Sequence, residues 1–305
     1  MKAPFPYFGS KSKIADRVWA ALGQPKHYIE PFFGSGAVLL NRPDWVPIMT
    51  ETVCDKDGHL ANVWRALQFA PDSVARICDW PVNHADLIAR RKTLIERQDD
   101  LLDALCRDDK FFDVELAGYW IWAASCWIGQ GLTRINAMPH VSNAGKGVHA
   151  KGQIPHVSDA GKGVQEPYNV NIYTWFRQLS ERLRYVRVVC GDWSRVCGGN
   201  WQDKMGNVGV FLDPPYSHDA GRDNNLYAVE DDCAKAVAKW AHERGRRPTY
   251  RIVLAGYDGE HNWLESEGWR VILWKARGGY SNLGKTNLNR HRERLWLSPH
   301  CLKGE

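Results

Sequence analysis

Short apolar runs bounded by turn residues recur near both ends of the chain. They lie at residues 27–32, 48–55, 186–192, 208–213, 251–257 and 270–276. Continuous runs of this length predict strands of a parallel sheet that is buried on both faces. Helical patterns lie between them, as at residues 231–245, where Ala234, Val237, Ala238 and Ala241 share one face. The alternation predicts a doubly wound α/β sheet, whose ligands bind beyond the carboxyl ends of the strands.

The alternation of strands and helices is interrupted between residues 65 and 186. Residues 84–107 instead carry apolar pairs at heptad spacing, namely Leu87 and Ile88, Leu94 and Ile95, and Leu101 and Leu102. This spacing predicts one amphipathic helix that packs within the molecule; the alternative is a coiled coil between two chains, for which three heptads are marginal. We interpret residues 66–185 as a second domain, inserted into a sheet domain formed by residues 1–65 and 186–305.

An internal repeat lies within the predicted insert, as PHVSNAGKGV at residues 139–148 and PHVSDAGKGV at residues 155–164. Each copy offers backbone N–H groups and a lysine, Lys146 or Lys162, that suit phosphate oxygens. A pair of plain turns or a β-hairpin is the alternative. The spacing GxxxxGK[ST] is missing, which excludes a Walker loop.

Composition narrows the class of protein. A chain of 305 residues with 44% hydrophobic residues can bury a large core, which excludes a disordered or fibrous protein. The net charge of +5 permits a polyanionic partner without requiring one. Eight cysteines without a CxxC pair predict reduced, mostly buried thiols and no metal site. No apolar signal core or membrane-length run occurs, so we expect a soluble, cytoplasmic protein.

The segment EPFFGSGAVLLN at residues 30–41 follows the first predicted strand and opens a helix. Its glycines allow a tight turn and a close approach of the backbone to a ligand. Asp55, about twenty residues on, ends the next predicted strand, a position from which an acid bonds a ribose hydroxyl. Together they predict an adenosine-containing ligand, either a dinucleotide or S-adenosylmethionine. A solvated acid at the end of a strand is the alternative for Asp55.

The predicted strand at 208–213 ends in Asp213, Pro214, Pro215 and Tyr216. Proline cannot donate to a sheet, so this segment must leave it as a rigid, outward-facing loop. The Asp213 carboxylate and the Pro214 carbonyl can accept both hydrogens of an amino group, while the Tyr216 ring can stack on the heterocycle that carries it. The four residues are the predicted catalytic site, for an exocyclic amine on a flat base.

The segments PYFGSKSK, EPFFGSG, CDKD and DPPY, in this order, resemble the Dam-like alpha group of DNA adenine-N6 methyltransferases. The resemblance covers about residues 4–65 and 186–297. It implies a Rossmann-like, S-adenosylmethionine-dependent methyltransferase sheet with an inserted, mainly helical target-recognition domain. It also implies methyl transfer to the N6 amine of an adenine flipped out of double-stranded DNA. The enzyme would be a cytoplasmic monomer or homodimer of bacterial or phage origin, either an orphan or one with a restriction partner.

The resemblance assigns the S-adenosylmethionine site. Tyr7 and Lys11 would flank the methionine part of the cofactor, Asp55 would bind the ribose, and Asp192 would bind the adenine. The predicted cofactor-binding residues are Tyr7, Lys11, Pro31, Phe32, Gly34, Ser35, Gly36, Asp55, Asp192, Trp193 and Asp213.

Basic loops are expected to contact the duplex. Arg134 and Asn136 are candidates for reading base edges, because arginine suits guanine and asparagine suits adenine. The resemblance implies an aromatic-rich loop over the flipped base after DPPY, a role that Tyr227 would fill. The predicted DNA-binding residues are Arg134, Asn136, Lys146, Lys162, Tyr227, Lys275, Arg277, Lys285, Arg290 and Arg292. Residues 275–294 form a C-terminal basic segment, for which a solvated surface loop is the alternative. The GKG repeat replaces the family's pattern after GLTRIN, so no target sequence is carried over.

Other functions fit parts of the pattern. An N4-cytosine methyltransferase would use the same amine chemistry but usually carries SPPY, and a protein-glutamine methyltransferase usually carries NPPY, so the acid favours adenine. A catalytically silent DNA-binding protein would not need Asp213 and the glycine loop. A small-molecule methyltransferase would not need so many basic loops.

Overall fold

The structure is a computed structural model that describes residues 1–7, 9–46, 49–127, 132–133, 171–204, 206–216, 233–274 and 292–303. The chain divides into two compact units. The first, here called the sheet unit, comprises Met1 and residues 9–54 and 185–305. The second, the helical unit, comprises residues 2–8 and 55–184. The role of residues 66–185 in target recognition stays a prediction.

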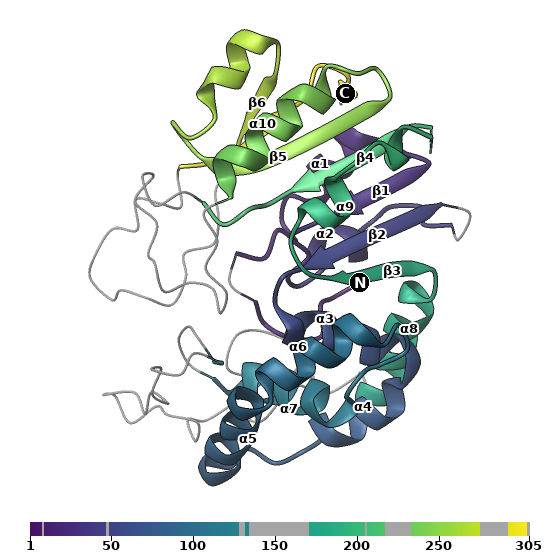
Figure 1. Ribbon diagram of the computed structural model, residues 1–305, viewed down its shortest axis with the longest axis vertical. Coiled ribbons are helices and arrows are strands. Elements are labelled where there is room, and N and C mark those ends of the chain that lie inside the picture. Colours follow the sequence, from purple (N-terminus) through teal and green to yellow (C-terminus); the bar gives the residue numbers. More distant parts are fainter. Residues whose placement is uncertain are drawn as a thin grey trace. The chain divides into compact units, whose positions relative to one another are not determined.

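A seven-stranded sheet with the order β3-β2-β1-β4-β5-β7-β6 forms the sheet unit (Figure 1). Its strands are β1 (His27–Glu30), β2 (Thr50–Asp55), β3 (Val186–Cys190), β4 (Val208–Leu212), β5 (Tyr250–Tyr257), β6 (Arg270–Leu273) and β7 (Glu293–Leu297). The pairings of β1 with β2, of β1 with β4 and of β4 with β5 are parallel. The predicted α/β class and the six predicted strands are therefore confirmed; five strands are somewhat shorter than their apolar runs, and β5 begins one residue earlier.

The strand β7 was not predicted, and it makes one edge of the sheet antiparallel. It pairs antiparallel with both β5 and β6, so β6 has no parallel neighbour in the sheet. The sequence favoured a basic loop up to Arg294, because only Leu295, Trp296 and Leu297 form an apolar run there. In the structure Arg294 lies in β7 and its guanidinium pairs with Asp258 at 3.1 Å.

Every residue of the central strands β1 and β4 is buried, because helices cover both faces of the sheet there. The helices of the sheet unit are α1 (Ala15–Leu22), α2 (Ala37–Leu40), α9 (Ser194–Cys197) and α10 (Ala234–Gly245), with short 3-10 turns η1 (Trp201–Lys204) and η3 (Asn262–Glu267). The predicted apolar face of α10 is confirmed, since Val237, Ala238 and Ala241 all join the core around Val210 and Trp296.

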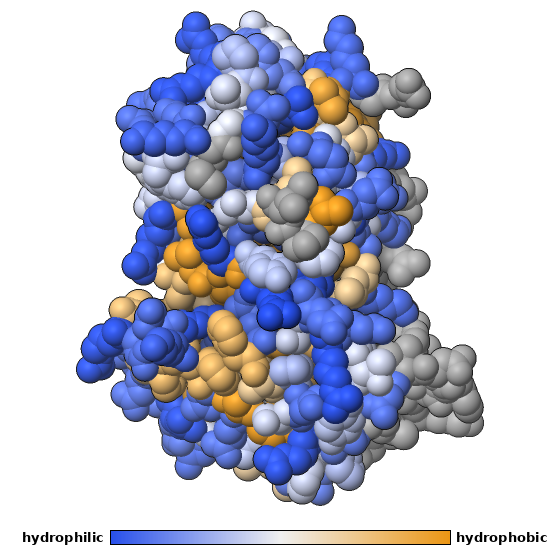
Figure 2. All heavy atoms as spheres, turned by 90° about the vertical axis from the view of Figure 1, so that its right-hand side faces the viewer, coloured by the Kyte–Doolittle hydropathy of each residue, from blue (hydrophilic) through white to orange (hydrophobic). Residues whose placement is uncertain are grey.

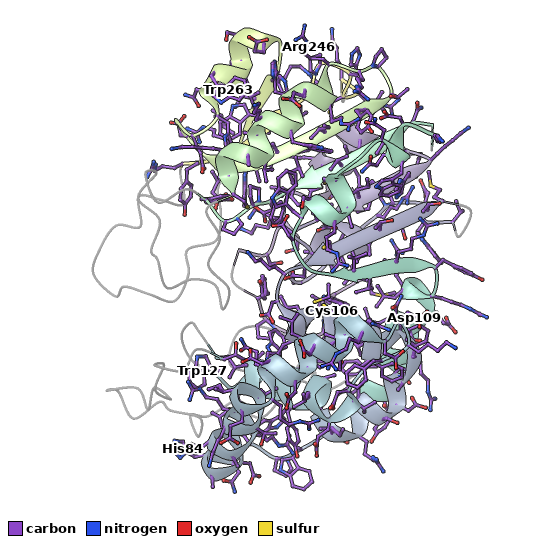
Figure 3. All side chains as sticks on the ribbon, viewed as in Figure 1. His84, Cys106, Asp109, Trp127, Arg246 and Trp263 are labelled. Carbon is purple, nitrogen blue, oxygen red and sulfur yellow. The ribbon has the colours of Figure 1, made fainter. Side chains whose placement is uncertain are left out.

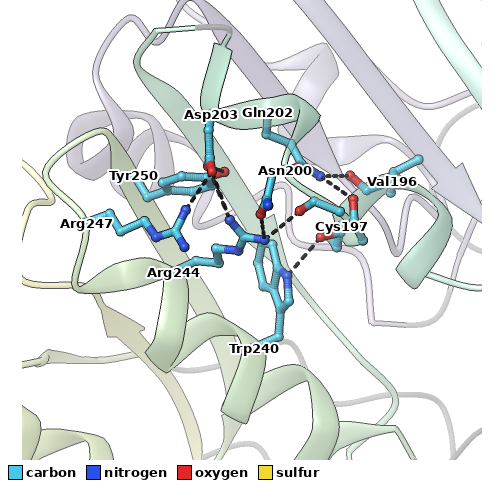
Figure 4. A network of polar contacts seen from close by, with 11 residues as sticks. Val196, Cys197, Asn200, Gln202, Asp203, Trp240, Arg244, Arg247 and Tyr250 are labelled. Atoms are coloured by element: carbon cyan, nitrogen blue, oxygen red, sulfur yellow. Dashed lines mark hydrogen bonds and ion pairs between the residues drawn. The ribbon is translucent and has the colours of Figure 1, made fainter.

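A polar network ties η1 to the start of β5 (Figure 4). The carboxylate of Asp203 accepts a hydrogen bond from the Tyr250 hydroxyl at 2.6 Å and pairs with Arg247 at 2.7 Å and Arg244 at 3.2 Å. The hydrogen bond from Tyr250 and the two arginines hold the pKa of Asp203 below its usual range.

Replacing Tyr250 by phenylalanine should lower the free energy of unfolding by about 1 kcal/mol, because one hydrogen bond to a charged group is lost while the ring stays buried. Urea denaturation measures this. Tyr173→Phe, at a tyrosine that lies outside this network, is the matched control and should leave the midpoint unchanged. An unchanged midpoint for Tyr250→Phe would mean that the network adds nothing to stability.

The helical unit consists of α3 (Gly58–Phe69), α4 (Pro71–Cys78), α5 (His84–Glu96), α6 (Gln98–Arg107), α7 (Val114–Cys126) and α8 (Ile172–Leu183). Helix α7 is its centre and packs against α3, α4 and α5. At the N-terminal segment, the ring of Phe5 packs edge-on against Trp120 at 4.7 Å and also contacts Trp64. Most of the hydrophobic residues of α7, Trp122 among them, are buried.

The prediction of one helix over residues 84–107 is wrong, because α5 ends and α6 begins around Arg97. The guanidinium of Arg97 pairs with Asp113 at 2.7 Å and with Glu115 at 3.3 Å, contacts that sequence spacing does not reveal. One member of each heptad pair faces the interior: Leu87 and Leu101 are buried, while Ile88 and Leu102 are exposed.

The cysteines are mostly buried, as the sequence predicts. Six of the eight cysteines are buried and all eight are free, whereas Cys106 of α6 is exposed (Figure 3). No helix in the described ranges is long and apolar enough to cross a membrane. Hydrophobic side chains reach the face in Figure 2 in separate patches among hydrophilic ones.

Candidate active site

The strand order places two predicted motifs side by side. Strand β1 has β2 on one side and β4 on the other, so the order of the strands reverses between β1 and β4. In open α/β sheets, ligands bind at such a switch point, outside the carboxyl ends of the strands. The glycine-rich segment follows Glu30, the last residue of β1, and the DPPY segment follows Leu212, the last residue of β4. Both motifs therefore leave the sheet at this crevice.

The glycine loop, residues 31–36, is a tight turn held by backbone hydrogen bonds. The N–H of Phe33 donates to the carbonyl of Cys54 in β2 at 3.0 Å, and the N–H of Gly36 donates to the carbonyl of Phe33 at 2.7 Å. Gly34 and Gly36 have φ values of 46° and 63°, which favour glycine. A Cβ on Gly36 would lie 2.7 Å from the Phe33 ring. The predicted cradle thus requires glycine at this position.

Replacing Gly36 by alanine should lower the free energy of unfolding by about 1–2 kcal/mol through the left-handed backbone, with a further loss from the clash with Phe33. If the loop is the predicted cradle for S-adenosylmethionine, binding of that molecule, measured by calorimetry, should weaken as well. Gly259→Ala is the control, since its φ of 92° is also positive but an added Cβ would meet nothing within 4 Å. Equal effects of the two substitutions would contradict the role of the Phe33 contact.

A buried ion pair joins Lys11 to Asp213. The Nζ atom of Lys11 lies 2.8 Å from Oδ2 of Asp213, with the two side chains 5% and 18% exposed, and it also donates to the carbonyl of Gly9 at 3.0 Å. Burial raises the pKa of Asp213, and the charge of Lys11 opposes that rise. For Lys11, burial alone would lower the pKa, but attraction to Asp213 and Glu293 outweighs it and the net pKa is raised. Lys11 is therefore a protonated partner of the predicted catalytic acid.

Tyr216 turns its side chain back into the protein. The ring is buried, its hydroxyl donates to Oε2 of Glu293 at 2.6 Å, and it packs edge-on against Tyr257 with centroids 4.4 Å apart. The Lys11 Nζ lies 5.4 Å from the Tyr216 centroid and 5.9 Å from that of Trp274. The prediction of an outward-facing loop is wrong for Asp213 and Tyr216, because the buried partners Lys11 and Glu293 draw both side chains inward.

Two further carboxyl groups surround this pair, and sequence reasoning missed both. Glu30 ends β1 and accepts a hydrogen bond from the Tyr28 hydroxyl at 2.8 Å; burial raises its pKa well above the usual range, and the nearby Asp213 adds to that rise. Burial also raises the pKa of Glu293, while Lys11 and Tyr216 oppose the rise. The available signal in the sequence was that Glu30 lies within the apolar run at residues 27–32 and that Glu293 lies beside the apolar residues 295–297.

The other predicted residues of the sheet unit have local partners. Asp192 accepts a hydrogen bond from the N–H of Ser194 at 2.9 Å, and the turn before it is joined to β2 by Cys54, whose thiol donates to the Gly191 carbonyl at 3.3 Å. Trp193 packs edge-on against Trp240 of α10 at 6.2 Å. The guanidinium of Arg292 lies 5.2 Å from the Tyr257 ring centroid.

Two predicted cofactor residues belong to the helical unit. Asp55 accepts a hydrogen bond from the N–H of Asp57 at 3.0 Å, and Asp57 in turn caps α3. Tyr7 packs edge-on against Phe5 at 6.1 Å. The remaining predicted DNA-binding residues lie outside the described ranges: Arg134, Asn136, Lys146, Lys162, Tyr227, Lys275, Arg277, Lys285 and Arg290.

Comparison with known proteins gives one match. Residues 7–115 match the family model of D12 class N6 adenine-specific DNA methyltransferases. The matched range contains Lys11, the glycine loop and Asp55, and the DPPY segment lies outside it. No curated protein matches the chain. The match confirms the resemblance to Dam-like adenine methyltransferases and indicates an adenine-specific DNA methyltransferase.

Proposed function

We propose that the enzyme transfers a methyl group from S-adenosylmethionine to the N6 amine of an adenine that has been flipped out of double-stranded DNA. The observation that carries this proposal is the partly buried carboxylate of Asp213 at the carboxyl end of β4, adjacent to the strand that leads into the glycine loop. One edge of the sheet thus offers an amine acceptor next to a loop whose backbone a ligand can approach closely.

The glycine loop fits an adenosine-containing methyl donor. Gly34 and Gly36 leave the backbone without side chains in the crevice, and we assign Pro31, Phe32 and Ser35 to the same cradle. Asp192 and Asp55 follow or end the strands β3 and β2, and both carboxylates can accept hydrogen bonds from hydroxyl or amino groups. S-adenosylmethionine, when bound, supplies a methyl group on a positively charged sulfur.

Asp213 and Pro214 would prepare the amine for attack. The lone pair of N6 is delocalised into the purine, so the nitrogen is a poor nucleophile while it is planar. If the Asp213 carboxylate and the Pro214 carbonyl each accept one N6 hydrogen, the nitrogen is drawn towards tetrahedral geometry and its lone pair is aimed. A C–N bond then forms as the C–S bond breaks, the bonding electrons pass to sulfur, and N6 loses a proton, for which Asp213 is the adjacent acceptor.

Lys11 and Tyr216 would serve the same step in different ways. The positive charge of Lys11 opposes protonation of Asp213, and a carboxylate must be ionised to act as an acceptor only. The Tyr216 ring can replace stacking that the base loses in leaving the duplex, which is worth about 1–3 kcal/mol per base.

The contacts with DNA remain at the level of proposals. We assign target recognition to residues 66–185, and duplex contacts to the predicted basic residues, of which the structure describes Arg292. The cytoplasmic location, the bacterial or phage origin and the state as monomer or homodimer stay predictions.

A methyl-transfer assay tests the proposal. The protein is incubated with double-stranded DNA and S-adenosylmethionine carrying a tritiated methyl group, and the methylated bases are then identified by mass spectrometry and mapped by sequencing. We expect label in N6-methyladenine at one short sequence. Label in N4-methylcytosine would replace the adenine assignment, and DNA binding without label would indicate a catalytically silent protein.

A further inference from the structure

Glu293 is a buried acid that the proposed reaction does not use. It begins β7 and its residue surface is 8% exposed. Its Oε2 atom accepts the hydroxyl proton of Tyr216 in a 2.6 Å hydrogen bond, although the two residues are 77 positions apart in the sequence. A hydrogen bond to an ionised acceptor is both stronger and shorter than one between neutral groups. The fold thus buries the carboxyl group of Glu293, at a cost in desolvation, next to the hydroxyl of Tyr216.

The sheet fixes the Tyr216 ring at a second point. In the antiparallel pairing of β5 with β7, Glu293 is the register partner of Tyr257. The Tyr257 ring meets the Tyr216 ring at an interplanar angle of 63° with centroids 4.4 Å apart, an edge-on arrangement. One pair of neighbouring strand residues therefore contacts Tyr216 at its hydroxyl and at its ring. These two contacts define the plane of the ring.

The backbone of Glu293 also orders the neighbouring aromatic residue. Its carbonyl accepts a hydrogen bond from the N–H of Trp274 at 3.4 Å, just after β6. The Lys11 ammonium lies within 6 Å of the centroids of both Trp274 and Tyr216, so the two rings border the same cation. Glu293 is thus connected, through its side chain or its backbone, to both aromatic rings next to the Lys11–Asp213 pair.

We propose that Glu293 is a positioning residue of the methyltransferase, which fixes the plane of the Tyr216 ring so that the flipped adenine stacks on it. This inference rests on the proposed function, because it requires Tyr216 to contact the base. A free tyrosine ring rotates about two side-chain torsions, and a base can stack only on a ring whose plane matches its own. Loss of Glu293 should therefore weaken capture of the flipped base more than the chemical step itself.

The test compares Glu293→Ala, Glu293→Gln and Tyr216→Phe in the full-length protein. The substrate is a duplex that contains the methylation site identified by the methyl-transfer assay. Glu293→Ala should raise the KM for DNA about tenfold with a smaller change in kcat. With 2-aminopurine in place of the target adenine, it should also lower the fluorescence change that accompanies base flipping. Glu293→Gln should recover most of the loss, because an amide oxygen can still accept the hydroxyl proton.

A double-substitution cycle separates positioning from general damage. Tyr216→Phe also removes the interaction of the hydroxyl with Asp213, so its loss can exceed that of Glu293→Ala. If Glu293 acts through the Tyr216 hydroxyl, the combined variant should be no worse than Tyr216→Phe alone. Glu267→Ala, at an exposed acid that pairs with His242, is the matched control and should leave all three measurements unchanged. Thermal melting confirms folding, and if Glu293→Ala does not fold, Glu293→Gln and Tyr216→Phe complete the comparison.

Opposite results would overturn the inference. Additive losses, or a fall in kcat with unchanged KM and unchanged fluorescence, would show that Glu293 does not act through Tyr216. An unaltered protein that transfers no methyl group would instead contradict the proposed function itself. The two failures are therefore distinguishable.

Discussion

Replacing Asp213 by alanine should lower the rate of methyl transfer to DNA by about 10³-fold, while S-adenosylmethionine binds almost normally. Asp213 is the proposed acceptor for an N6 hydrogen, and loss of one preorganised polar group at a reacting centre typically costs a factor of this size. The radioactive transfer assay under single-turnover conditions measures the chemical step, and calorimetry measures cofactor binding.

Asparagine at this position is the informative comparison. Asp213→Asn keeps an acceptor oxygen of nearly the same shape but removes the negative charge that pairs with Lys11 at 2.8 Å. We expect it to retain more activity than Asp213→Ala, because one N6 hydrogen can still be accepted. If Asp213→Ala methylates DNA at nearly the rate of the unaltered protein, Asp213 is not the acceptor of the N6 hydrogen.

The Asp213→Ala variant also has a predictable effect on folding. It leaves the buried Lys11 ammonium without its closest partner, and breaking a buried pair on one side typically costs about 3–5 kcal/mol. The neighbouring Glu293 moderates this loss, since it too attracts Lys11. Activity must therefore be compared at a temperature at which both variants are folded.

The strands and the glycine loop could be predicted because their signals are local. A run such as residues 208–212 needs only its own apolar residues to mark a buried strand, and two prolines mark its end. Gly36 likewise marks a turn through its own backbone freedom. Strand β7 carries no such local signal, since its first two residues, Glu293 and Arg294, are charged. Both are accommodated by partners from distant parts of the chain, Tyr216 and Asp258.

The motif residues of the site could be predicted from the sequence, but the charged groups that surround them could not. Asp213 and Tyr216 were recognisable from the motif, whereas their partners come from the N-terminal segment and from β7. Nothing in the spacing of Lys11 or Glu293 indicates that either meets the DPPY residues, because the pairing depends on which strands are neighbours in the sheet. The break between α5 and α6 has the same origin, a long-range contact of Arg97 with Asp113.

Replacing Lys11 by methionine should lower methyl transfer at pH 7 and move the acid limb of the kcat profile to higher pH. Burial raises the pKa of Asp213, and Lys11 provides the nearest opposing charge. Without that charge the pKa rises further, so a larger fraction of Asp213 is protonated at neutral pH and cannot accept an N6 hydrogen. Activity should return as the pH is raised through the new pKa. Stopped assays between pH 5.5 and about 9.5 would follow the limb.

The same variant decides between two roles for Lys11. The sequence resemblance assigns Lys11 to the methionine part of S-adenosylmethionine, whereas its 2.8 Å contact with Asp213 points to the acid. A weaker affinity for S-adenosylmethionine with an unmoved acid limb would support the first role and contradict the second. Lys11→Arg keeps the charge and should keep the limb near its original position. Lys13→Met, at an exposed lysine two residues away, should change neither quantity, so any shift specific to Lys11 reports the buried pair.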